Sequence, residues 1–415
     1  MRGWAPDSDS IHGNALNMND RTAFEALCAD LAELRHDLHA HPELAFREER
    51  TSNLVAERLA ALGLEVDRGL AGTGVVGTLR RGEGGTIGLR ADMDALPLDE
   101  HTGLGYASRQ PGLMHACGHD GHTTMLLGAA TWLAEHGGFS GTCHFIFQPA
   151  EENLAGGRRM VDEGLFERFP MDAVFGLHNW PGIEAGCMGV RSGPVMAAAD
   201  FFELRISGTG GHAAYPHRAR DPIVAAAQII GAWQTLVSRS SDPLAAAVLS
   251  VTRIQGGTTE NVIPDRVTLG GTVRTFDESV QQNIEQGMRR MAEGIATAHG
   301  VEVDLDYQRR YRSTVNDAEA AAVALKAMER TVGPERIVRD LPPTMGAEDF
   351  GWMLAACPGA YVMLGNGTQG AHGRALHNPG YDFNDGVIGI GVRYWVELVH
   401  GTLREEAATD RPMHR

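Results

Sequence analysis

The residues from His115 to His122 could bind a transition metal. Three histidines, Cys117 and Asp120 fall within these eight residues. A thiolate and an imidazole two residues apart, as at Cys117 and His119, can reach one ion together from a turn or a strand end. Such ligands suit zinc or a similar metal. A free buried cysteine beside surface histidines is the alternative interpretation, and further ligands would have to come from elsewhere in the chain.

A pair of aspartates follows the strand that is predicted over residues 86–90. This strand leads into Asp92 and Asp94, and Pro97 then ends the strand pairing. If the strand continued through both aspartates, their carboxylates would point the same way, because side chains alternate along a strand. The alternative is that the two aspartates cap a turn.

Two adjacent glutamates, Glu151 and Glu152, follow the strand predicted over residues 142–148, and a third apolar run reaches His178. Adjacent glutamates usually lie on a solvated surface. Here they follow an apolar strand directly, where repulsion and burial would cost free energy unless a cation were present. The repeated pattern of an apolar strand followed by a ligand-type residue favours a metal site.

The predicted strands alternate with helical segments such as residues 123–134, which indicates a mostly parallel sheet. In such sheets, functional sites gather at the carboxyl ends of the strands. We therefore expect one cluster of side chains at that edge of the sheet: Asp92, His119, Glu151, Glu152 and His178.

A second, smaller unit begins near residue 193. Its strands and helices follow the order βαββαβ, which is typical of a ferredoxin-like fold. The elements are predicted at residues 201–207, 221–238, 246–255, 266–276, 278–299 and 301–308. The chain then returns to helix, strand and helix, so the small unit is inserted into the large one.

The expected fold class is therefore α/β, with a mixed, mostly parallel sheet in the large domain and an inserted ferredoxin-like α+β lid domain. The large domain is expected in two parts, residues 21–192 and 309–406, on either side of a lid at 193–308. Residues 1–20 are predicted to form a disordered leader, and residues 407–415 a tail.

The composition of the chain indicates which partners are excluded and in which cellular compartment the protein is expected. A formal net charge of −17 argues against nucleic acid or an anionic membrane surface as the main partner. Five cysteines, odd in number and far apart, are typical of a protein from a reducing cytosol, so we expect a cytoplasmic location. No apolar run reaches the roughly 18 residues that a membrane span needs, and the first residues lack the apolar core of a signal peptide.

Ordered motifs along nearly the whole chain resemble one known family. They lie at residues 35–44, 90–97, 115–122, 147–152, 211–214, 261–265, 346–350 and 376–385. This set is similar to the metal-dependent aminoacylase and carboxypeptidase family of amidohydrolases, specifically its hippurate-hydrolase and indole-acetyl-amino-acid-hydrolase branch.

The resemblance implies a metallohydrolase with two divalent ions in each chain, zinc or manganese and, as further options, cobalt or nickel. The implied protein ligands are Cys117, His119, Glu152, His178 and His377. Glu151 would be the general base. Asp94 would orient a metal ligand by contacting that ligand and not the metal itself. Related branches carry a histidine ligand where Asp92 stands, so the role of Asp92 is left open.

The inserted domain resembles the lid and dimerisation domain of the family. By this resemblance His212, Asn261 and Arg274 would face the substrate, with His212 supplied by the other subunit of a homodimer. The segment from Tyr215 to Pro222 carries more basic residues than the branch leads us to expect, which concerns substrate preference rather than chemistry.

The implied reaction is hydrolysis of an N-acyl amino acid, with an acetyl, benzoyl or similar acyl group, to a carboxylic acid and an amino acid. Glu151 would take a proton from a water that the metals acidify. His212 would stabilise the oxyanion, while Arg274 and Asn261 would hold the substrate carboxylate.

Three alternatives stay open at this stage. The chain could be a dipeptidase, carboxypeptidase or N-deacetylase of the same family. The sequence does not separate these activities, because the acyl pocket is built by apolar side chains that are scattered along the chain. It could be an amidase in which Cys117 attacks and His119 is the base, although Glu151 and Glu152 would then have no purpose. It could also be a metal-binding scaffold without catalytic activity.

Overall fold

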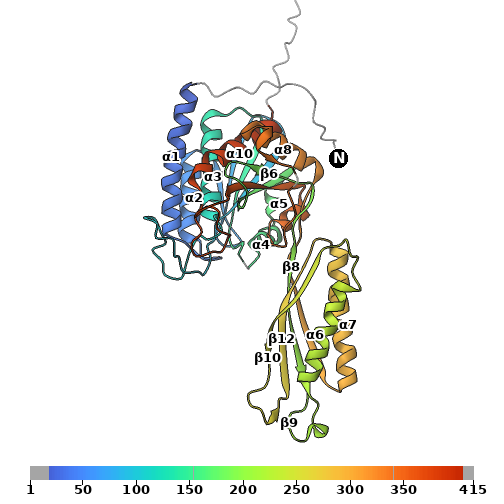
Figure 1. Cartoon of the computed structure of the whole chain (residues 1–415). Coiled ribbons are helices and arrows are strands. Elements are labelled where there is room, and N and C mark those ends of the chain that lie inside the picture. Colours follow the sequence, from blue (N-terminus) through green and yellow to red (C-terminus); the bar gives the residue numbers. More distant parts are fainter. Residues whose placement is uncertain (1–17, 153, 340, 405–415) are drawn as a thin grey trace, which may run out of the picture.

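The computed structural model describes residues 18–152, 154–339 and 341–404 (Figure 1). The first helix, α1 (Met18–Ala40), begins inside the predicted leader, whose residues 1–17 lie outside the described part of the chain, as does the predicted tail at 407–415. In the described ranges, the helices are all too short or too polar to cross a membrane.

The large domain is built on an eight-stranded sheet in the order β1-β2-β4-β3-β5-β16-β6-β15. Its strands are β1 (Glu65–Leu70), β2 (Gly74–Arg81), β3 (Thr86–Asp92), β4 (Gly141–Gln148), β5 (Ala173–Pro181), β6 (Met188–Gly189), β15 (Ile337–Val338) and β16 (Gly359–Gly367). The central strands β4, β3, β5 and β16 pair in parallel. At one side of the sheet, β1 pairs antiparallel with β2, and β2 pairs antiparallel with β4. The predicted mixed, mostly parallel sheet is confirmed.

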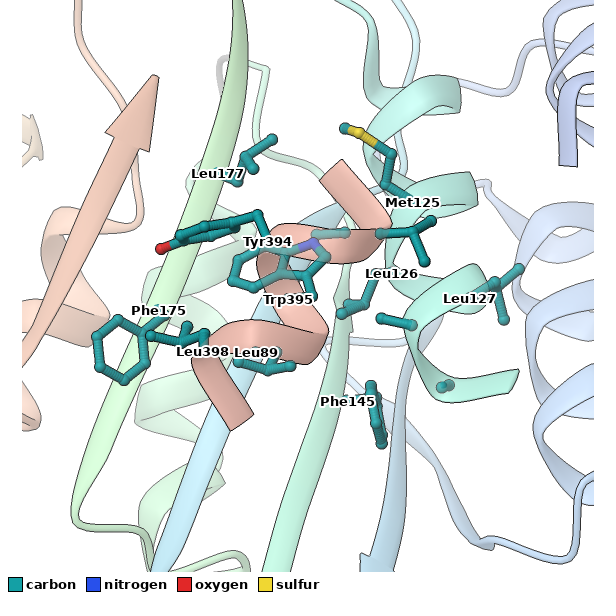
Figure 2. Packing of buried hydrophobic residues seen from close by; sticks show 14 of the residues in the cluster. Leu89, Met125, Leu126, Leu127, Phe145, Phe175, Leu177, Tyr394, Trp395 and Leu398 are labelled. Atoms are coloured by element: carbon teal, nitrogen blue, oxygen red, sulfur yellow. The ribbon is translucent and has the colours of Figure 1, made fainter. Parts of the chain in front are cut away.

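Helices cover both faces of this sheet. Successive strand residues point to opposite sides, and the central strands are buried at almost every position, so both faces need a covering layer. One face packs against α1, α2 (Glu49–Ala61), α3 (His119–His136), α8 (Ala318–Val332) and α10 (Ile388–Thr402). The other face packs against α4 (Gly156–Asp162), α5 (Leu165–Arg168) and α9 (Gly351–Ala356). Figure 2 shows the first of these cores, where Trp395 of α10 and Leu126 of α3 lie over Leu89 of β3.

Helix α3 begins at His119, four residues before the predicted start at Thr123. The reason is Gly118, which precedes the helix with φ +92. A Cβ at this position would lie 2.3 Å from Oδ1 of Asn179. Only glycine combines this backbone conformation with so close an approach, and the early start puts His119 in the first turn of the helix.

The lid is a second unit with its own core. Its sheet has the order β10-β12-β8-β13 and every pairing is antiparallel. The elements are β8 (Ala198–Ser207), α6 (Pro222–Ser238), β10 (Ala247–Gln255), β12 (Arg266–Thr275), α7 (Glu278–His299) and β13 (Glu302–Tyr311). Both helices cover one face of the sheet (Figure 1), where Trp233 and Leu269 are fully buried. This order confirms the ferredoxin-like lid.

Short elements join the two units and complete the fold. The chain enters and leaves the lid through β7 (Gly193–Met196) and β14 (Thr314–Asn316), which pair with each other. At the far end of the lid, β9 (Gly211–His212) pairs with β11 (Val262–Ile263). The 3₁₀ turns are η1 (Pro216–Arg218), η2 (Pro334–Arg336) and η3 (Asp385–Val387). Strand β13 runs to Tyr311, past the predicted lid boundary at residue 308.

Candidate metal centre and active site

His119, in the first turn of α3, lies between the two aspartates that end and follow β3. Its Nδ1 is 3.3 Å from Oδ1 of Asp94, and its Nε2 is 3.7 Å from Oδ2 of Asp92. Burial alone would lower the pKa of His119, but the charges of Asp92 and Asp94 raise it to about 10. Neither ring nitrogen has a hydrogen-bond partner among the described residues. A metal ion held by this buried imidazole would replace its proton and face the same acidic groups.

Cys117 and His178 face each other across the same centre. The Cys117 Sγ is 3.4 Å from Nε2 of His178. The His178 Nδ1 donates to the Asn179 carbonyl at 2.6 Å, which leaves Nε2 unprotonated and directed at the centre. A second hydrogen bond of this kind is the usual support of a metal-binding histidine. Burial and the nearby Glu152 and Glu151 raise the pKa of the Cys117 thiol, so a cation is needed to hold it as a thiolate.

Glu152 and His377 complete the donor set. Their Oε1 and Nε2 atoms are 3.1 Å apart. His377 has the left-handed φ of +64, and its backbone amide donates to the Ala116 carbonyl at 2.8 Å. Burial raises the pKa of Glu152, but the hydrogen bond with His377 and the charge of His119 outweigh it and lower the pKa. The turn that carries His377 is thus tied to the segment that carries Cys117.

The donors form overlapping groups of three whose ligand atoms lie within 4.8 Å of one another. These groups are Cys117 with His119 and His178, Cys117 with Glu152 and His377, and His119 with Glu151 and Glu152. Cys117 belongs to two of them. A donor set of one shared thiolate, imidazoles and a carboxylate therefore fits two divalent ions side by side.

Glu151 is buried in an acidic part of the site. Burial raises its pKa, and Glu348 and Glu152 raise it further. Glu151, Glu348 and Asp349 form another acidic group, but Arg90 donates to Glu348 at 2.9 Å and to Asp349 at 3.1 Å. Because the guanidinium already pairs with these two carboxylates, we assign no metal there. Among the described residues Glu151 makes no ion pair with a cation, and its raised pKa gives it the proton affinity that a general base needs.

Asp94 and Asp92 have different surroundings. Asp94 accepts the backbone amides of Glu151 and Glu152, at 3.0 and 2.9 Å, so it fixes both glutamates as well as approaching His119. Asp92 accepts from Nη1 of Arg90 at 2.8 Å and lies 2.6 Å from Nδ1 of His122. Asp92 is thus held within a buried network of hydrogen bonds behind His119.

A pocket of about 280 Å³ opens beside these donors, between the large domain and the lid. Trp180, Met196, Phe201 and Leu376 contribute apolar surface to its lining. From the lid comes Arg274, which donates to the Thr272 hydroxyl and the Val273 carbonyl and makes no ion pair with a carboxylate in the described ranges. A half-buried guanidinium without an acidic partner is suited to bind an anion.

His212 and Asn261 do not line this pocket. Strand β9, which ends at His212, lies at the far end of the lid (Figure 1), and the adjacent Ala213 amide donates to the Asn261 carbonyl at 3.0 Å. His212 is exposed, and Val262 pairs with it across β9 and β11. The structure therefore brings these two residues to each other but not to the metal donors of the same chain.

Comparison with known proteins places the chain in a family. The profile of peptidase family M20/M25/M40 matches residues 88–401. The chain belongs to this family. It is 39% identical to a hippurate hydrolase of Campylobacter jejuni over 90% of this chain and 96% of that protein. It is 40% identical to an N-acetylcysteine deacetylase of Bacillus subtilis over 91% and 97%. A solved Bacillus subtilis structure, described as a dinuclear metal binding peptidase, has a TM-score of 0.80 and 36% identity, covering 91% and 99%.

The family assignment from the motifs is thus confirmed, and the M20 fold with its inserted lid agrees with the structure. Sequence reasoning missed several buried groups around the centre. Arg90 neutralises the acids near Glu151, Glu48 contacts the segment before it, and Tyr311 donates to the Glu151 carbonyl at 2.7 Å. Arg90 lies inside the motif at residues 90–97 and Glu48 lies four residues after the motif at 35–44, but a single sequence gives no sign of which side chains turn inward.

Proposed function

We propose that this protein hydrolyses the amide bond of N-acyl amino acids with two divalent metal ions. The observation that carries the proposal is the shared position of Cys117 in two groups of donors. Beside them is a pocket lined by Arg274, whose guanidinium makes no ion pair with a carboxylate of the described residues. The activities named for the Campylobacter and Bacillus relatives, on hippurate and on N-acetylcysteine, support the same substrate class.

The side chains of the site have two proposed roles: some are metal ligands and others transfer protons. Cys117, His119, Glu152, His178 and His377 would hold the ions. Bound divalent ions lower the pKa of water and polarise a carbonyl. Glu151 takes the proton of the attacking water and returns one to the leaving amine, while Asp94 keeps Glu151 in place through its backbone amide.

The substrate is proposed to lie with its carboxylate on Arg274. The pocket places the apolar side chains of Trp180, Met196 and Leu376 beside the metal donors, where an acyl group can pack. We propose zinc as the native metal because a thiolate and imidazoles are its preferred ligands, with manganese, cobalt and nickel as the metals to compare. Five free cysteines support a cytoplasmic location.

A substrate screen tests this function. N-acetyl, N-benzoyl and longer acyl amino acids are assayed with each metal, and N-benzoylglycine is compared with its carboxamide. We expect kcat/KM to be at least about tenfold higher for the free acid, since a hydrogen bond to a charged group contributes about 1.5–3 kcal/mol. Equal kcat/KM values for the acid and the amide would show that Arg274 does not bind the substrate carboxylate. Hydrolysis of peptides alone would favour the peptidase alternative.

The cysteine-nucleophile alternative has less support. The ring nitrogen hydrogen-bonded to Cys117 belongs to His178 rather than to the proposed base His119. Burial and the acidic neighbours raise the pKa of the Cys117 thiol, whereas a nucleophilic cysteine needs a lowered pKa.

A homodimer through the lid is the second part of the proposal, with residues 193–308 as lid and dimerisation domain and 21–192 and 309–406 as the catalytic domain. Strand β10 lies at an open edge of the lid sheet, and Tyr215, Ile223, Ile254 and Val262 are exposed apolar residues of the lid. An open edge beside exposed apolar side chains is suited to a two-fold contact.

The dimer would allow His212 to reach the active site of the partner subunit. We expect His212→Ala to lower kcat by about 10²–10³-fold, as for the loss of one oxyanion donor, with folding and metal content unchanged. Mixing this variant with Glu151→Gln should restore part of the activity, because one site of each hybrid receives both wild-type groups. Subunit exchange is shown first with tagged chains. Inactive hybrids after proven exchange, or a monomer in solution, would rule out action across the interface.

A further inference from the structure

The three consecutive backbone amides at residues 150–152 all donate hydrogen bonds to buried carboxylates, and two carboxylates share the three amides. Asp94 accepts the amides of Glu151 and Glu152. The amide of Ala150, immediately before them, donates to Oε1 of Glu48 at 2.9 Å. Glu48 is distant in sequence, at the start of α2, so the segment that bears the proposed base and a proposed ligand is held by two separate parts of the chain.

The backbone at Ala150 needs this support. Alanine has φ +55 there, in the left-handed region that costs free energy for a residue with a Cβ. The turn is closed by the Gly156 amide, which donates to the Ala150 carbonyl at 2.9 Å. On the other side, the Tyr311 hydroxyl donates to the Glu151 carbonyl at 2.7 Å. Strained backbone persists only where its surroundings hold it.

Glu48 is directed to this turn instead of to its own helix. It stands at the N-cap of α2, yet its side chain makes no capping hydrogen bond. Glu43 caps the helix in its place, by accepting the amides of Arg50 and Thr51 at 2.9 and 2.8 Å. The Glu48 carboxylate is fully buried and also accepts from the Phe46 amide at 3.0 Å and the Thr73 hydroxyl at 2.6 Å.

We propose that Glu48 is a positioning residue for the reaction. By accepting the Ala150 amide, it holds the left-handed turn from which Glu151 reaches the attacking water and Glu152 reaches the metal. The inference rests on the proposed function, because it takes Glu151 as the base and Glu152 as a ligand.

The role requires an acceptor of the right shape rather than a negative charge. Burial raises the pKa of Glu48 to about 7, and the charge of Asp94 adds to this increase. A neutral side chain is therefore well tolerated at this position. Glutamine keeps an oxygen for the Ala150 amide, and its amino group can donate to the Thr73 hydroxyl. Glu48→Gln should thus preserve the turn, whereas Glu48→Ala leaves a buried amide without an acceptor.

The test compares Glu48→Ala and Glu48→Gln with a control at a second left-handed alanine, where the accepting carboxylate is exposed. In the control, Glu163→Ala, the lost carboxylate accepts the amide of Ala71 at 2.6 Å. Ala71 is another left-handed alanine, with φ +52, in the turn between β1 and β2. All variants are assayed with saturating metal for kcat and KM on an N-acyl amino acid, and their melting temperatures are measured.

For Glu48→Ala we expect kcat to fall by about 10–100-fold, the usual range for a group that orients a metal ligand, with KM within about twofold of wild type. Glu48→Gln and Glu163→Ala should keep kcat within about twofold. Wild-type kcat in Glu48→Ala, no rescue by glutamine, or an equal loss in the control would each overturn the inference.

A second readout separates this inference from the proposed function. Zn²⁺ binding to the metal-free proteins is measured by calorimetry, without substrate. We expect Glu48→Ala to bind Zn²⁺ about 10–100-fold more weakly than wild type and Glu48→Gln. If the wild type hydrolysed no N-acyl amino acid, the proposed function would fail, while this comparison would still decide whether Glu48 positions Glu152. Equal Zn²⁺ affinity in all three proteins would count against Glu48.

Discussion

Glu151→Gln is expected to lower kcat by at least about 10²-fold, the contribution of a general base, without loss of metal. Glutamine keeps the shape of the side chain and its ability to accept the Asp349 amide, which lies 3.4 Å from Oε1 of Glu151, but it cannot take a proton. Each of the two donor groups that share Cys117 has three members, and Glu151 belongs to neither group. The variant should therefore bind its ions and substrate and fail at proton transfer.

The neighbouring residue provides the matched control. Glu152→Gln changes the same chemical group one position along, on the same turn, but removes a carboxylate that lies 3.1 Å from Nε2 of His377. We expect this variant to lose metal as well as activity. The measurements are kcat, KM and metal content by elemental analysis for both variants. Normal turnover by Glu151→Gln, or loss of its metal, would contradict the assignment of roles.

Removing the metals is the second change with a large expected effect. Dialysis against a chelator should reduce hydrolysis to background, because Glu151 alone cannot make water a strong nucleophile at neutral pH. Cys117→Ala should have the same result without a chelator, since both groups of donors lose their shared thiolate.

Cys143→Ala is the matched control for Cys117→Ala. Cys143 is also a buried free cysteine, in β4, and it belongs to none of the donor groups. Burial raises the pKa of its thiol to a value well above the usual range. This variant should keep its metal and its activity, apart from a small loss of stability from the cavity. Full metal content in Cys117→Ala would show that the thiolate holds no ion.

Much of the fold followed from strand and helix patterns in the sequence. The apolar runs that became β3, β4 and β5 predicted the parallel centre of the sheet, and the βαββαβ order predicted the lid. The two-residue strands β6, β15, β9 and β11 were missed because a run so short has no periodicity. The start of α3 was missed because Gly118 opens the helix through its backbone conformation, which periodicity does not reveal.

The candidate site was predictable where ligand-type residues follow strands. Glu151, Glu152 and His178 are brought together for that reason, since β4 and β5 both run parallel to β3. His377 could not be found this way, because it sits on a turn with φ +64, and its implied role came from the family resemblance alone. Glu48 was missed because its partner is a backbone amide 102 positions away.

The most direct test of a two-metal hydrolase is to titrate metal-free wild-type protein with Zn²⁺ and, separately, Mn²⁺ while measuring hydrolysis of an N-acyl amino acid. The two groups of donors that share Cys117 predict no activity without metal and a rise that ends at two ions per chain. Full activity in protein shown to be free of metal would contradict metal-dependent hydrolysis, and a rise that ends at one ion would contradict the second site.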